Sequence, residues 1–133
     1  MAKGLDNFKK RQDELKSFGK DLAKRSRSKC ELCGAAGVHL DIFEVPPVHQ
    51  EPDFDRCIFM CETCGSALGS IRKKSTEHWR CLTDKIWSGI PAVKVLSVMI
   101  LKEISSREPW AAALLEEVYL DEEEEAWSSK GLF

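Results

Sequence analysis

The sequence of 133 residues lacks a long hydrophobic run, which excludes a protein that crosses a membrane on a helix. Such a helix needs roughly 18 or more consecutive apolar residues. The longest candidate, Ala92 to Leu101, is interrupted by Lys94. The sequence also lacks an apolar segment close to Met1, so it shows no secretory signal. We therefore expect a cytoplasmic protein with no membrane partner.

Disulfide bonds are not expected either, although the sequence contains six cysteines. Thiols in a reducing compartment stay free, where they serve as metal ligands or as buried apolar groups. Low-complexity sequence is limited to one run of four glutamates, and no internal repeat occurs beyond a cysteine motif. A chain of this length has the size of one domain.

The cysteine motif occurs twice, as Cys30-Glu-Leu-Cys33-Gly34 and as Cys61-Glu-Thr-Cys64-Gly65. Two Cys-x-x-Cys pairs can converge on one ion, and Zn²⁺ prefers four such ligands in a tetrahedron, about 2.3 Å from each sulfur. The glycine after each pair suits a tight turn, because it tolerates positive φ. We predict one structural Zn²⁺ held by Cys30, Cys33, Cys61 and Cys64.

Charge is divided unevenly along the chain, although the net charge is only −2. Residues 1–30 contain ten basic and four acidic side chains, whereas acids concentrate near the C-terminus in residues 116–125. A basic arm can bind nucleic acid. It can also be the solvated face of a helix, and we favour this second interpretation because the pI of the whole chain is about 5.9. Nucleic-acid binding is therefore possible but not favoured.

Hydrophobic periodicity predicts helices at both ends of the chain and a short hairpin between the cysteine pairs. Residues 5–26 are predicted to form one amphipathic helix. Strands are expected at 39–45 and 56–60, separated by a loop that begins at Pro46-Pro47. Three C-terminal helices are predicted at 92–104, 110–120 and 122–127. The first of these should be the most buried element, with Pro91 in its first turn and Asp121 capping the last helix.

The segment after Cys64 distinguishes two zinc architectures. A zinc ribbon continues from its second cysteine pair into a strand, whereas a treble clef begins a helix there. Residues 66–74 lack β-branched alternation and end in basic residues, which favours a helix and a treble clef. The predicted fold is α+β: a four-cysteine module at 30–75, preceded by a basic helix and connector at 1–29 and followed by a helical region at 76–133. Together these parts are expected to form a single compact domain.

Several strings in this order resemble a known family. They are Cys30-Glu-Leu-Cys-Gly34, Phe43-Glu-Val-Pro-Pro47, Met60-Cys-Glu-Thr-Cys64, His78-Trp-Arg-Cys-Leu82, Ile86-Trp-Ser88 with Ile90-Pro-Ala-Val93, and Tyr119-Leu-Asp-Glu-Glu123 with Ala126-Trp127. Over about residues 25–128 the chain resembles the N-terminal zinc-binding region of bacterial PhnA-like proteins, the alkylphosphonate uptake family. The resemblance implies a zinc module in a phosphonate-related context. A hydrolase acting on phosphonates such as phosphonoacetate follows from the family label alone.

Catalysis by the predicted zinc is disfavoured. A hydrolytic zinc keeps a position open for water, whereas four thiolates fill the shell. The layout is also similar to that of HNH nucleases with a structural zinc, in which the strand after the first cysteine pair ends in paired histidines. Here that place holds Phe43-Glu44-Val45, so a general base and a metal ligand are missing.

The remaining cysteines, histidines, basic residues and tryptophans suggest further sites, none of which is favoured. His78 and Cys81 could form half of a second metal site, completed by Cys57 or His39, but core packing of Trp79 and Cys81 is favoured. A thioredoxin-like use of Cys61 and Cys64 conflicts with the second cysteine pair. The cluster Arg72-Lys73-Lys74 is the natural phosphate contact if nucleic acid is bound. Most of the four tryptophans should be buried, and an exposed one would be a candidate for docking a partner.

The function predicted from the sequence is structural zinc binding in a non-catalytic interaction or regulatory module with an unidentified protein partner. The alternatives are a nucleic-acid-binding zinc protein and a phosphonate hydrolase or degenerate HNH-like nuclease.

Overall fold

The computed structural model describes residues 2–71 and 76–132, which form an α+β fold, as predicted. Two helices, α1 (Ala2–Ser17) and α2 (Gly19–Ser26), precede an antiparallel hairpin of β1 (Leu40–Glu44) and β2 (Cys57–Cys61). A short 3₁₀ helix, η1 (Phe54–Arg56), leads into β2. Helix α3 (Glu62–Gly69) follows β2 without a loop. The hairpin therefore delivers the chain directly into the second cysteine pair.

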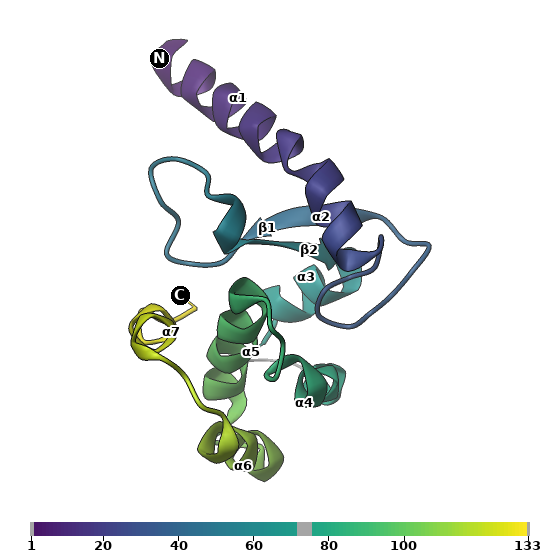
Figure 1. Ribbon diagram of the computed structural model, residues 1–133, viewed down its shortest axis with the longest axis vertical. Coiled ribbons are helices and arrows are strands. Elements are labelled where there is room, and N and C mark those ends of the chain that lie inside the picture. The colour runs from purple at the N-terminus through teal and green to yellow at the C-terminus, as the bar shows by residue number, and fades with distance from the viewer. Residues whose placement is uncertain (1, 72–75, 133) are drawn as a thin grey trace.

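The C-terminal half is helical. It comprises the 3₁₀ helix η2 (Glu77–Cys81), α4 (Leu82–Lys85), α5 (Pro91–Ile104), α6 (Pro109–Glu117) and α7 (Glu122–Ser128). Helices α4, α6 and α7 surround α5 (Figure 1). Ten of the fourteen residues of α5 are buried, so the prediction for this helix is confirmed. Pro91 stands at its start, and Asp121 caps α7 in a capping box with Glu124.

The hairpin separates two apolar clusters because successive side chains of a strand point to opposite faces. On one face, the paired Ile42 and Phe59 pack against Leu15 and Leu22 of α1 and α2. On the other face, Ile58 belongs to the main core together with α5. The basic N-terminal helices thus cover one side of the sheet and the C-terminal helices cover the other.

The prediction of one helix over residues 5–26 is wrong. The chain forms two helices that meet at Phe18, a half-buried residue whose ring makes an edge contact with Phe54 at a centroid distance of 5.6 Å. Leu22 of α2 packs against the sheet, where it is fully buried, while α1 projects away from the body (Figure 1). The basic α1 and the acidic α7 consequently lie at a distance from each other.

Other boundaries shift by a few residues. Helix α3 begins at Glu62 and ends at Gly69, where the sequence predicted a helix over 66–74. The cluster Arg72-Lys73-Lys74 lies outside the described residues. Trp79 is buried as expected, but Trp87 is 55% exposed. The division into segments 1–29, 30–75 and 76–133 stays a prediction.

Candidate metal centre

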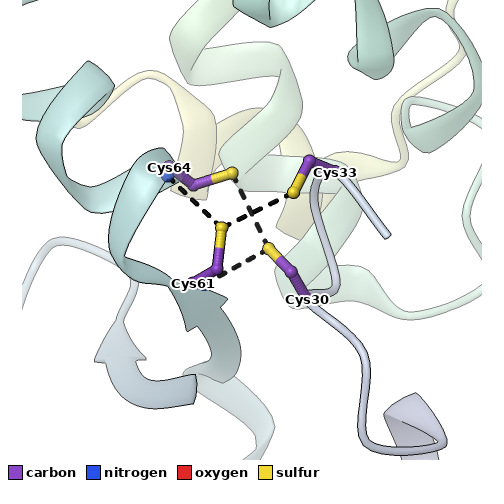
Figure 2. Close-up of side chains that lie close together, drawn as sticks. All are labelled: Cys30, Cys33, Cys61 and Cys64. Carbon is purple, nitrogen blue, oxygen red and sulfur yellow. Dashed lines mark hydrogen bonds between the residues drawn. The ribbon is translucent and has the colours of Figure 1, made fainter. Parts of the chain in front are cut away.

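Four cysteines from two distant segments converge on one point. The ligand atoms of Cys30, Cys33, Cys61 and Cys64 all lie within 4.8 Å of one another (Figure 2). Three of these cysteines are buried, and Cys33 is half-buried. Such a group could hold a metal ion. The structure thus brings together all four residues that the sequence selected.

The spacing of the sulfurs suits a tetrahedral ion. Cys30 Sγ lies 3.7 Å from Cys64 Sγ, and Cys33 Sγ lies 3.5 Å from Cys61 Sγ. In a regular tetrahedron with metal–sulfur bonds of about 2.3 Å, neighbouring sulfurs are about 3.8 Å apart. Each close pair joins one cysteine of the first motif to one of the second. An ion at the centre would therefore join the two motifs.

The first cysteine pair lies in a tight turn fixed by backbone hydrogen bonds. Gly34 N–H donates to Cys30 O, and Cys30 N–H donates to Ala35 O, both at 2.9 Å. Gly34 has φ of +79°, in the left-handed region that favours glycine. The prediction of a glycine with positive φ is confirmed here, but Gly65 lies inside α3 and has no such φ. The two motifs are built differently, one on a turn and one on a helix.

The second pair occupies the N-terminus of α3. Cys61 is the N-cap residue, and its sulfur accepts a hydrogen bond of 3.4 Å from the Cys64 N–H. The first turn of a helix presents unpaired N–H groups and a partial positive charge, which favours a thiolate at that position. The second motif therefore places its cysteines at the N-terminal end of a helix, where a backbone N–H contacts a sulfur.

A buried carboxylate attaches the first cysteine pair to the sheet. The Glu31 side chain accepts a hydrogen bond of 2.9 Å from the Phe59 N–H, and the Glu31 N–H donates to Phe59 O. Arg25 donates to both carboxylate oxygens, at 3.0 and 2.7 Å, and to Cys57 O. Sequence reasoning missed this role for Glu31, because nothing in the motif distinguishes a buried glutamate from an exposed one.

The thiols strongly influence one another's ionisation. The hydrogen bond between Cys30 and Cys64 lowers the pKa of Cys30 to about 4, aided by backbone N–H groups and opposed by burial. The same hydrogen bond, followed by burial, raises the pKa of Cys64. Burial raises the pKa of Cys33. Four sulfurs this close cannot all carry charge without a cation, which is the chemistry of a metal-thiolate site.

His78 and Cys81 lie beside this centre and do not form a separate metal site with Cys57 or His39. Among the described residues, the four-cysteine group alone has the close spacing of metal ligands. His78 Nε2 lies 3.2 Å from Cys64 Sγ, a suitable distance for an N–H···S hydrogen bond. Burial, then the charges of Cys33 and Cys30, raise the pKa of Cys81 to about 11. His78 thus contacts Cys64, one of the four predicted metal ligands, directly.

Cys57 lies outside the four-cysteine centre. It is fully buried, and its Sγ donates to Asp53 O at 3.3 Å. Burial, followed by the charges of Glu44 and Asp53, raises its pKa to about 11. A neutral buried thiol of this kind acts as a small apolar side chain.

Comparisons of the chain with models of protein families, with curated proteins and with solved structures found no match. No helix among the described residues is long and apolar enough to cross a membrane. The resemblance to PhnA-like proteins therefore stays a prediction, and the function has to be inferred from the chemistry of the site.

Proposed function

We propose that this protein binds one structural Zn²⁺ through Cys30, Cys33, Cys61 and Cys64, and that the folded module serves in a non-catalytic interaction. The observation that carries the proposal is the set of sulfur–sulfur distances, 3.5 and 3.7 Å, which match the edge of a zinc tetrathiolate. The module is proposed to be a treble clef, because α3 begins directly after Cys61.

A structural role is favoured over catalysis by the number and type of the ligands. A catalytic zinc keeps one position for water or substrate, whereas four thiolates complete the tetrahedron and reduce the acidity of the ion. Removing the ion would leave four crowded thiols at the junction of the first turn, the hairpin and α3. Structural zinc contributes on the order of 10–16 kcal/mol in small zinc-binding peptides. An ion at this junction would therefore stabilise the fold strongly.

The decisive experiment measures the metal content of purified protein after desalting, by mass spectrometry of the native protein and by elemental analysis. We expect about one zinc per chain. Cys64→Ser should lower the zinc content and the unfolding temperature. Cys57→Ser is the matched control, because Cys57 is equally buried but lies outside the centre, and it should retain zinc. A folded protein that contains no zinc would refute the proposal.

A further inference from the structure

The two edges of the hairpin differ, because one is covered and the other is open. On the outer edge of β2, the N–H and C=O of Phe59 both bond to Glu31, and Cys57 O accepts a hydrogen bond from Arg25. On the outer edge of β1, no hydrogen bond from the described part of the chain reaches the backbone. The open edge of the sheet therefore belongs to β1.

The ladder shows which backbone groups of β1 face outward. In an antiparallel pair, residues that bond across the ladder alternate with residues whose N–H and C=O face away from it. Ile42 is paired with Phe59. Because both backbone groups of Phe59 face away from β1 toward Glu31, those of Ile42 face away from β2. The same alternation turns the N–H and C=O of Leu40 and Glu44 outward.

Two grooves lie along this edge, and both are lined by Asp41 and Ile42. The α1-side groove has a volume of about 480 Å³, and Lys16 of α1 lies in its wall. The α3-side groove has a volume of about 330 Å³ and is lined by Met60 and by Gly65, which has no side chain to fill it. A strand added to β1 would place its side chains alternately in the two grooves.

We propose that the strand added to this edge is β1 of a second copy of this chain, paired antiparallel about a two-fold axis at Ile42. In this register Ile42 lies opposite Ile42, and Leu40 lies opposite Glu44, so every outward N–H and C=O finds a partner. Asp41 lies opposite Phe43, and like charges do not face each other. Moving the axis to Asp41 would instead place two carboxylates directly opposite each other, which is unfavourable.

The charge in the α1-side groove favours this occupant. Glu44 bonds to Arg11 of α1, so the side chains of Leu40, Ile42 and Glu44 lie on the face of the hairpin that α1 covers. Glu44 of the second copy, opposite Leu40, therefore enters the α1-side groove. Lys16 is exposed there and forms no ion pair with a described residue. The symmetry of the pairing creates this contact between unlike charges twice.

The α3-side groove also suits the side chain that would enter it. Phe43 is half-buried, and in the second copy it lies opposite Asp41, beside Met60 and Gly65. Glu62 also lines this groove, but it follows Cys61 and so lies at the end away from Asp41 of the second copy. Burial of the phenyl ring against Met60 is therefore not opposed by two facing carboxylates.

The composition of β1 agrees with a paired edge. Lysine and proline commonly keep an exposed sheet edge from pairing, and β1, with the sequence Leu-Asp-Ile-Phe-Glu, contains neither. Pairing would join two two-stranded sheets into one of four strands. The proposal does not depend on which ion the four cysteines hold.

The experiment combines sedimentation equilibrium with NMR amide exchange on the purified full chain, at low and at high protein concentration. We expect a reversible dimer at high concentration. The amide hydrogens of Leu40, Ile42 and Glu44 should exchange rapidly in the monomer and slowly in the dimer. The amide of Phe43, which bonds to β2, should be protected in both states.

Lys16→Glu should raise the dissociation constant of the dimer by about tenfold, because it replaces attraction by repulsion at two symmetry-related contacts. The matched control is Lys24→Glu, which makes the same change of charge at an exposed residue of α2 that lines neither groove and should dimerise like the wild type.

A chain that stays monomeric at every concentration would overturn the proposal. So would a dimer in which the three outward amides exchange as rapidly as in the monomer, or one that both substitutions weaken equally. Zinc content, determined on every sample, tests the zinc proposal separately.

Discussion

Replacement of His78 offers a test of how the cysteine centre is supported from outside its ligand set. His78 Nε2 lies 3.2 Å from Cys64 Sγ, and the imidazole makes an edge contact with Trp79 at a centroid distance of 4.9 Å. His78 contacts a predicted ligand, but among the described residues it does not belong to the closely spaced group of four. Its expected role is therefore to donate a hydrogen bond to a thiolate.

The size of the effect follows from the type of hydrogen bond. A hydrogen bond to a charged group contributes about 1.5–3 kcal/mol, which corresponds to about tenfold to a hundredfold in an equilibrium constant. Loss of an outer hydrogen bond to a metal ligand typically lowers metal affinity by a similar 10–100-fold. We predict that His78→Phe lowers zinc affinity by this amount, because it keeps a ring beside Trp79 but removes the donor.

The assay is competition with a chelator for zinc, together with the visible spectrum of the cobalt-substituted protein. His78→Gln retains an N–H donor and should recover part of the affinity lost in His78→Phe. His49→Ala removes an exposed histidine outside the centre and should change neither measurement. Equal zinc affinity of His78→Phe and the wild type would refute the reasoning. Loss of the tetrahedral cobalt signature would instead identify His78 as a ligand.

Two further predictions concern the surroundings of the centre. Arg25→Ala should lower the free energy of unfolding by about 3 kcal/mol in a urea titration, because it leaves the Glu31 carboxylate, which is 5% exposed, without its charged partner. Lys24→Ala, which removes an exposed neighbouring side chain, should change the free energy of unfolding little. Equal effects of the two variants would contradict this role of Arg25. Cys57 should resist alkylation at about pH 8 in the folded protein and react on unfolding, because with a pKa of about 11 only about one thiol in a thousand is ionised there. Since burial raises this pKa above the usual 9.0, the folded state holds the proton more tightly. The contribution of the Cys57 proton to the free energy of unfolding is complete below pH 9 and is lost as the pH rises from about 9 to about 11. Cys57→Ala should therefore lose less stability than the wild type over this pH range, so that its alkaline unfolding midpoint lies at higher pH relative to its stability at neutral pH. An unchanged alkaline midpoint would count against this contribution.

Local patterns in the sequence were enough to identify the four cysteines and most of the helices and strands. A Cys-x-x-Cys spacing places two sulfurs on one turn whatever the rest of the chain does, so the ligand set could be selected without the fold. The starts of α5 and α7 could also be predicted, because Pro91 at the first helical position and the N-cap Asp121 act within a few residues of their own positions. These features depend on covalent neighbours alone.

The tertiary structure decided everything that depends on the path of the chain between the motifs. It placed His78 beside Cys64 and put Glu31 against β2, and no spacing in the sequence encodes either contact. The interruption between α1 and α2 at Phe18, whose ring packs against Phe54, was not predicted either, because the apolar periodicity continues through it. The sequence by itself thus determined which residues can bind a metal, and the fold determined what surrounds them, because distance in space is set by packing and not by position in the chain.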